Sequence, residues 1–221
     1  FYSCKTMNLN VLQSGYNIKS EINFNLNWGL GSSSSLISVI AQWLKVNAYD
    51  LNRKIFKGSG YDIACASVSS PLIYSIKSVT PLVKDVSFNP VFKEHLYFIW
   101  LNKKQDTRSE IVKLDGTKNY QLEVAQINAL TLEFASCHNL RDFQQLMLAH
   151  EKIISKVIGS EKIQHIFFPD FKGAIKSLGA WGGDFIMAAS KKTFHEVEKY
   201  FNQKGFTTVL RWNDLFPNKT D

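Results

Sequence analysis

The chain has 221 residues, a formal net charge of +7 and a hydrophobic fraction of 45%. A chain of this size can bury a sizeable core, as one large domain or two small ones. Its basic residues are scattered without a continuous stripe or interleaved aromatics, so we expect attraction for anionic small molecules and no nucleic acid binding. No run of about 18 apolar residues is present, which argues against a membrane-spanning helix.

The spacing of the cysteines and histidines argues against disulfide bonds and against a zinc site. Cys4, Cys65 and Cys137 are odd in number and widely spaced, which favours free thiols in a reducing compartment. We therefore expect a cytoplasmic protein. The 5 histidines show no metal-ligand spacing with the cysteines, so no zinc site is expected.

A strand, a loop and a helix are predicted in succession near the start of the chain. Residues 21–28 alternate between apolar and polar side chains, which predicts a strand. The loop Gly-Leu-Gly-Ser-Ser-Ser-Ser follows at residues 29–35. Apolar residues then recur at helical spacing, and they are Leu36, Val39, Ile40, Trp43 and Leu44.

The composition of this loop indicates a phosphate cradle. Glycines permit positive φ angles and a close approach of the backbone to a ligand. The first turn of the following helix offers unpaired N–H groups and a partial positive charge, and the serine hydroxyls add donors. The loop is not a Walker loop, because the G-x-x-x-x-G-K-[ST] spacing and its lysine are absent. The alternative is a serine-rich N-cap after a glycine turn, without a ligand.

A second informative segment is Gly-Ser-Gly-Tyr-Asp-Ile-Ala-Cys-Ala at residues 58–66. A short helix over residues 51–56 is predicted to end at Gly58, and Pro71 precedes a predicted strand over residues 72–76. Asp62 lies where a turn becomes a helix. It either caps that helix or accepts and orients a hydroxyl proton beside the phosphate cradle.

The rest of the chain contains further strands and helices around a second glycine loop. In order, we predict a strand over residues 96–101, helices over 120–137 and 141–158, a strand over 185–189, a helix over 194–203 and a strand over 206–210. Thr193 and Glu196 form a capping-box pattern at the start of the last helix. The final strand, helix and strand are typical of half of a split βαβ fold.

The two central helices are predicted to be core elements. The first is expected to pack through Leu122, Ile127, Leu130 and Phe134. His150 lies on the apolar face of the second helix, where a core or boundary histidine is expected rather than a metal ligand.

Together, these segments resemble the GHMP kinases, the superfamily of galactokinase, homoserine kinase, mevalonate kinase and phosphomevalonate kinase. Residues 29–35 are similar to the second family motif, which binds the nucleotide phosphates. Lys-Ser-Leu-Gly-Ala-Trp-Gly-Gly-Asp at residues 176–184 resembles the third motif, in the form closest to phosphomevalonate kinases. Gly-Tyr-Asp-Ile-Ala at residues 60–64 resembles the tract that carries the catalytic aspartate, and it spells the name of the GYDIA-type subgroup.

The resemblance implies an α+β fold of two domains. Residues 1–93 would form the ATP-binding domain, similar to ribosomal protein S5 domain 2 and lacking its first strands. Residues 94–221 would form the C-terminal GHMP domain, with a ferredoxin-like (split βαβ) arrangement.

The implied activity is phosphoryl transfer from ATP to a small-molecule hydroxyl or phosphate acceptor, with Mg²⁺, at the mevalonate or phosphomevalonate step of isoprenoid synthesis. Asp62 would be catalytic, and Ser33 would lie near Mg²⁺. The implied ATP-binding residues are Gly29, Leu30, Gly31, Ser32, Ser33 and Ser34. The implied substrate and phosphate loops comprise Ser59, Gly60, Gly179, Ala180, Gly182, Gly183 and Asp184. A homodimer is left open.

The chain departs from the family pattern in four places. Asn25 replaces a proline of the second motif, Trp181 replaces a glycine of the third, and the lysine-containing first motif is absent. Leu51 stands where mevalonate kinases carry a magnesium-binding glutamate. The alternatives are therefore a related enzyme, such as a diphosphomevalonate decarboxylase or a sugar or homoserine kinase, and a nucleotide-binding regulator without turnover.

Overall fold

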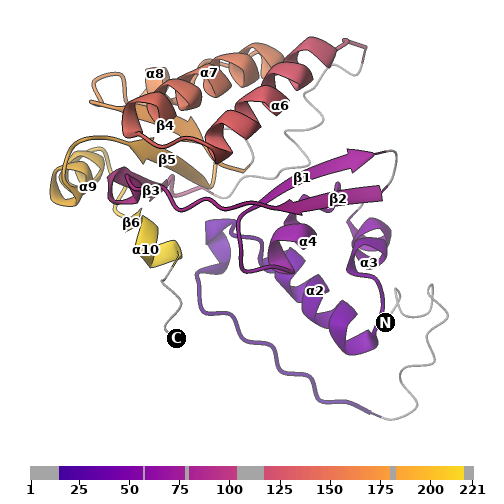
Figure 1. Ribbon diagram of the computed structural model, residues 1–221. Coiled ribbons are helices and arrows are strands. Elements are labelled where there is room, and N and C mark those ends of the chain that lie inside the picture. Colours follow the sequence, from indigo (N-terminus) through magenta and orange to yellow (C-terminus); the bar gives the residue numbers. More distant parts are fainter. Residues whose placement is uncertain (1–14, 57, 78–79, 104–116, 180–182, 217–221) are drawn as a thin grey trace. The chain divides into compact units, whose positions relative to one another are not determined.

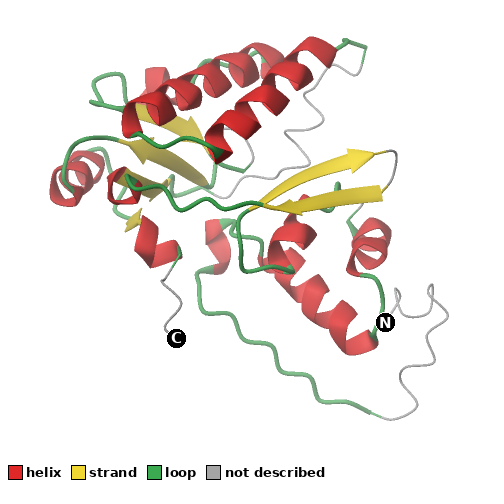
Figure 2. Ribbon diagram, in the orientation of Figure 1, coloured by secondary structure: helices red, strands yellow, loops and turns green. Residues whose placement is uncertain are grey.

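The computed structural model describes residues 15–56, 58–77, 80–103, 117–179 and 183–216. The fold is mixed α+β with antiparallel sheets, as predicted, and Figure 1 and Figure 2 show its elements. The chain divides into two compact units. The first comprises residues 1–26 and 30–87, and the second comprises residues 27–29 and 88–221.

The first unit packs three helices and a hairpin. Its elements are α2 (Ser32–Leu44), α3 (Ala48–Ile55), α4 (Tyr61–Ala66), β1 (Leu72–Lys77) and β2 (Thr80–Asp85). The strands β1 and β2 pair antiparallel. The three helices share one buried cluster, made of Ile37, Ala41, Leu51 and Ile63. The predicted helix before Gly58 and the predicted strand after Pro71 are both confirmed.

The strand predicted over residues 21–28 is wrong. Residues 15–25 form no strand, and a 3₁₀ helix, η1, covers Leu26–Trp28. Alternating residues form a strand only where a neighbouring strand supplies hydrogen bonds, and none of the described strands lies in a sheet with this segment. The apolar side chains of Ile22 and Leu26 consequently stay exposed, at 39% and 57%.

The helix after the glycine loop is confirmed, but its predicted apolar face is only partly the buried one. Leu44 is buried and Ile40 packs against the core cluster, as predicted. Leu36, Val39 and Trp43 are exposed. The buried residues of α2 are Ser34, Ile37, Ala41 and Leu44. Both stripes have helical spacing, and α3 and α4 pack on the stripe that contains the small residues, because small side chains allow helices to approach closely.

The second unit is built on a four-stranded sheet. Its strands are β3 (Leu96–Trp100), β4 (Ala174–Ser177), β5 (Phe185–Ala189) and β6 (Val209–Arg211), in the order β4-β5-β3-β6, and each neighbouring pair is antiparallel. Its helical elements are η2 (Lys93–His95), α6 (Gln121–Ala135), α7 (Leu140–Ile158), α8 (Ile163–Phe167), α9 (Phe194–Gln203) and α10 (Trp212–Leu215). The last predicted strand is shifted, since β6 begins at Val209 rather than at residue 206.

The two faces of this sheet carry separate cores. Successive side chains of a strand point to opposite faces, so Leu96 and Tyr97 join different clusters. One cluster contains Phe143 and Met147 of α7, and the other contains Phe201 of α9.

The helix α6 packs against α7. Ile127, Leu130 and Phe134 are half-buried, and the ring of Phe134 meets that of Phe143 on α7. Leu122 is 65% exposed, so the prediction that it packs is wrong. Within the described ranges, no helix has both the length and the apolar character needed to cross a membrane.

Candidate functional site

The glycine-serine loop leads into α2 through two glycines with a left-handed backbone. Gly29 and Gly31 have φ angles of 67° and 77°, in the left-handed region that favours glycine. Gly31 is the N-cap of α2, and no described side chain caps this helix. The hydroxyl of Ser35 instead donates to the Gly31 carbonyl, 3.0 Å away.

The serines of this turn differ in accessibility. Ser33 is exposed, whereas Ser34 is 9% exposed and belongs to the buried face of α2. An uncapped helix N-terminus leaves N–H donors and a partial positive charge for an anion. The described residues contain no cluster of three metal-ligating side chains. They would therefore fit Mg²⁺ only through a single group such as the Ser33 hydroxyl, with the phosphates as the other ligands.

Asp62 lies in the first turn of α4 but does not cap it. The N-cap is Gly60, with φ at 85°, and no described side chain caps this helix. The capping role considered for Asp62 is therefore wrong. Its carboxyl is accessible to solvent, yet the surrounding protein displaces enough water to raise the pKa of this group.

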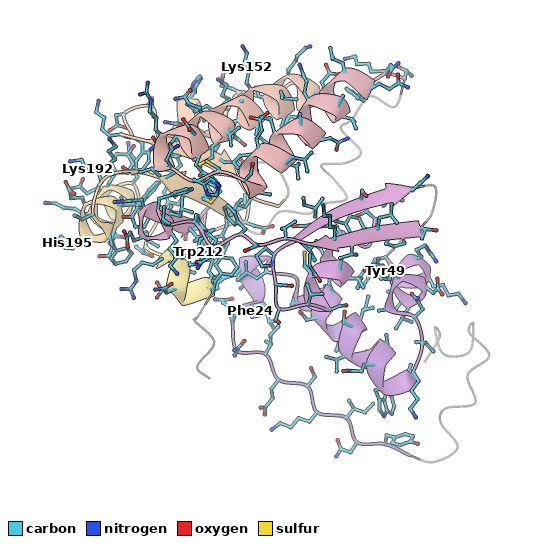
Figure 3. All side chains as sticks on the ribbon, viewed as in Figure 1. Phe24, Tyr49, Lys152, Lys192, His195 and Trp212 are labelled. Atoms are coloured by element: carbon cyan, nitrogen blue, oxygen red, sulfur yellow. The ribbon has the colours of Figure 1, made fainter. Side chains whose placement is uncertain are left out.

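The turn before Asp62 is fixed by aromatic side chains. A Cβ on Gly60 would lie 2.8 Å from the ring of Tyr49, which Figure 3 labels on α3. The hydroxyl of Tyr74 donates to the Ser59 carbonyl at 2.5 Å, and its ring meets that of Tyr61 edge-on. Tyr49 and Tyr74 thus pack against the turn at Ser59 and Gly60 that precedes Asp62.

The glycine-serine turn and Asp62 lie at the starts of neighbouring helices of the first unit. The helices α2 and α4 pack directly on each other. Ile37, one turn beyond the serines, and Ile63, next to Asp62, belong to the same buried cluster.

The second glycine loop connects β4 and β5 in the second unit. Gly179 has a φ angle of 63°, Gly183 is buried, and Asp184 is 9% exposed with a φ angle of 51°. The predicted site residues Ala180 and Gly182, like Trp181, lie outside the described residues.

The first glycine loop, at Gly29, and the second glycine loop, at Asp184, meet within the second unit. A Cβ on Gly29 would lie 2.4–2.6 Å from the carboxyl atoms of Asp184, and a Cβ on Gly179 would lie 3.8 Å from the same carboxyl. Next to them, the rings of Trp28 and Phe185 meet edge-on with their centroids 5.8 Å apart. Residues 27–29 therefore pack with the second unit, although both flanking segments belong to the first.

Sequence analysis missed a buried polar cluster beside the third motif. Glu151 of α7 is 1% exposed, and its Oε1 accepts the backbone N–H of Ser177 at 3.2 Å. The Lys176 ammonium donates to the Ser177 carbonyl at 2.9 Å. No described residue hydrogen-bonds to Glu151 Oε2, Ser177 Oγ or the buried Nδ1 of His150.

The ionisation of this cluster is strongly perturbed. Burial raises the pKa of Glu151 to about 7, against the opposing effects of Lys176 and the Ser177 N–H. Burial also lowers the pKa of Lys176. Burial, and then the charge of Lys176, lower the pKa of His150 to about 3. The sequence did contain a signal, because Glu151 interrupts the apolar stripe of Leu140, Phe143 and Met147.

The same edge of the sheet is covered elsewhere by a glutamine. β4 is an edge strand, and Gln164 of α8 accepts from the Ile175 N–H at 2.9 Å and donates to the Gly173 carbonyl at 3.1 Å. Side chains that pair with an exposed edge prevent pairing with another chain, so part of the role of Glu151 is structural.

A hollow bordered by α9 contains none of the described motif residues. Its charged lining is mixed, with Lys172, Lys192 and Lys199 beside Asp170 and Glu196. Lys192 is paired with Glu196 at 2.7 Å, so this hollow is a weaker candidate for an anion site than the start of α2.

Comparison with solved structures gives a likeness that supports the fold. Neither a scan against protein-family models nor a search of curated proteins gave a match. Among solved structures, the chain is similar to a crystal structure of a Lin0012 protein from Listeria innocua, with a TM-score of 0.61 and 19% identity. The likeness covers 83% of this chain and 66% of that one, so the chain spans just under two thirds of its neighbour's length.

Proposed function

We propose that this chain is an ATP-dependent small-molecule kinase of the GHMP type. The observation that carries the proposal is the start of α2, where two left-handed glycines lead into an uncapped first turn with Ser33 exposed. This turn can bind phosphates through backbone N–H groups and the helix dipole. The helix of Asp62 packs on the same helix.

The topology of the second unit supports the same proposal. Its strands and helices follow the order β3, α6, α7, α8, β4, β5, α9, β6, with β5 between β3 and β4 in the sheet. This order supports the split βαβ, or ferredoxin-like, arrangement that the resemblance implies for a C-terminal GHMP domain. The first unit would correspond to the S5-like ATP-binding domain.

In the proposed reaction, the backbone of residues 29–34 holds the ATP phosphates, and the Ser33 hydroxyl would be a ligand for Mg²⁺. Asp62 orients the acceptor hydroxyl and takes its proton while the oxygen bonds to the γ-phosphorus and the bond to ADP breaks. When bound, Mg²⁺ would neutralise charge on the phosphates. Positioning and charge stabilisation then supply most of the catalysis.

The raised pKa of Asp62 is compatible with this role. A general base works best when its pKa approaches the working pH, and displacement of water around the carboxyl shifts it in that direction. The proposed acceptor is a mevalonate-like or phosphomevalonate-like isoprenoid precursor, in the cytoplasm. That choice follows from the form of the third motif, and fold alone is a weak guide to substrate.

The test is ADP release with Mg-ATP and a panel of mevalonate, phosphomevalonate, diphosphomevalonate, homoserine and simple sugars. A kinase gives acceptor-dependent ADP with the wild-type chain and none with Asp62→Asn, while both bind ATP. Asp85→Asn, at the end of β2, is the matched control and should retain turnover. ATP binding without turnover on any acceptor would favour the regulator instead, and release of CO₂ would favour the decarboxylase.

A further inference from the structure

Asp184 has a combination of features that the proposed reaction does not explain. It is 9% exposed, and it adopts a left-handed backbone conformation. Its N–H donates to the Lys103 carbonyl at 2.9 Å, and its carbonyl accepts the Leu101 N–H at 2.8 Å. Residues other than glycine seldom adopt this conformation, and such residues concentrate at functional sites.

The side chain of Asp184 faces glycines from both motifs. Its carboxyl lies where a Cβ on Gly29 would stand, and 3.8 Å from where a Cβ on Gly179 would stand. Gly29 itself is left-handed. Carboxylates are strong acceptors for backbone N–H groups, and close contact of one with a glycine turn restricts the conformations open to that turn.

We propose that Asp184 is a positioning residue that holds the Gly29 turn in the conformation from which the phosphate cradle starts. This inference rests on the proposed function. Asp184 is not assigned a direct phosphate contact, because a carboxylate repels the triphosphate. The carboxyl acts on the nucleotide through the backbone at Gly29, and the charge itself is not required.

The first test compares two substitutions of Asp184 in the full chain. Asp184→Ala should weaken Mg-ATP binding about tenfold, because small displacements of positioning groups are costly. Adenosine binding should stay unchanged, since adenosine lacks the phosphates. Asp184→Asn keeps the shape, an acceptor oxygen and tolerance of the left-handed backbone, so it should bind Mg-ATP nearly as well as the wild type.

The second test is a double-mutant cycle read in the denaturation midpoint. Gly29→Ala places a Cβ against the Asp184 carboxyl, whereas Gly31→Ala has the same left-handed strain with no described atom within 4 Å. Asp184→Ala should therefore reduce the loss of stability caused by Gly29→Ala, and it should leave the loss caused by Gly31→Ala unchanged.

The outcomes separate the two proposals. If the wild type binds Mg-ATP and Asp184→Ala binds it equally well, the positioning role is overturned and the kinase proposal stays intact. Equal losses with Asn and Ala also overturn it, because that result would indicate a required charge, as in a metal ligand. Additivity of Asp184→Ala with Gly29→Ala overturns the contact itself. Absence of Mg-ATP binding by the wild type overturns the proposed function.

Discussion

The carboxyl of Asp62 controls the pH dependence that the proposed chemistry should show. Displacement of water raises its pKa above the ordinary value for aspartate, and the general base must be deprotonated to act. Turnover should therefore fall as the pH drops through this raised pKa, at a higher pH than an ordinary aspartate would give.

The pH profile of kcat, measured with a saturating acceptor, checks this prediction. Asp62→Asn should abolish turnover at every pH. If that variant retained activity, and its activity fell at low pH as that of the wild type does, another group would be the base.

His150 should make the folded protein sensitive to acid. Its pKa is lowered to about 3 in the folded state by burial and by Lys176, whereas an unfolded histidine has a pKa of about 6.5. A lowered folded pKa means that the contribution of His150 to stability is complete above pH 6.5 and is lost progressively as the pH falls toward 3. Between pH 7 and pH 4.5 this contribution should fall by about 2 kcal/mol, read as the difference between the wild type and His150→Gln.

Chemical denaturation at these two pH values checks the prediction with His150→Gln. That variant should lose less stability than the wild type on acidification, since glutamine cannot take up the proton. His195→Gln, at an exposed histidine, is the matched control substitution. An equal change in stability on acidification in the wild type and in His150→Gln would assign the effect to other groups.

Glu151 acts in the opposite sense, because its pKa is raised to about 7. Its contribution to stability is complete below pH 4.5 and is lost as the pH rises through 7.

Among the structural elements, the β4–β5 hairpin depends on a glycine at its start. A Cβ on Gly173 would lie 2.2 Å from the Ala189 carbonyl oxygen, an approach that real Cβ atoms do not make. Gly173→Ala should therefore destabilise the fold by about 2 kcal/mol, through backbone displacement at the edge of the sheet.

The matched control is Gly58→Ala, whose Cβ would meet only Asn52 Nδ2, at 3.8 Å. Urea denaturation of both variants checks the prediction, with a shifted midpoint for Gly173→Ala alone. Similar midpoints would mean that the hairpin adjusts without cost.

The sequence predicted best those elements whose ends are determined locally. The helix α9 has the predicted bounds, because Thr193 and Glu196 form the capping box that their spacing indicates. The segment at residues 21–28 had the right alternation for a strand, but pairing depends on a distant partner and was not predictable. In α2, two stripes had helical spacing, and the packing of α3 and α4 selected the less hydrophobic one.

The candidate site was predictable in its motifs and not in its contacts. Left-handed glycines at positions 29 and 31 follow from the loop sequence. The approach of Asp184 to Gly29 joins segments that are far apart in the chain, and no local pattern encodes it. Glu151 was not predicted as a core residue because the other buried residues of α7, Leu140, Phe143 and Met147, are all apolar.

At the scale of the whole molecule, the net charge of +7 should assist the capture of a nucleotide. A positively charged protein attracts an anionic ligand over long distances, and salt weakens this attraction. At 0.1 M salt the attraction is largely screened beyond a Debye length of about 10 Å. The affinity for Mg-ATP should therefore decrease as NaCl rises from low to high concentration, and the affinity for adenosine should not. Titrations at several salt concentrations check this, and equal salt dependence for both ligands would argue against recognition through the phosphates.

The chain passes between the two units at the proposed cradle. Residues 27–29 belong to the second unit and α2 belongs to the first.

Equilibrium titration of the wild-type chain with Mg-ATP bears most directly on the proposed function. We expect saturable binding of one nucleotide per chain, with a dissociation constant in the range of about 1 μM to 1 mM that is usual for enzyme substrates. Adenosine should bind more weakly, because the loop at residues 29–34 recognises phosphates. Absence of saturable binding at millimolar Mg-ATP would contradict the phosphate cradle and, with it, the assignment as a kinase.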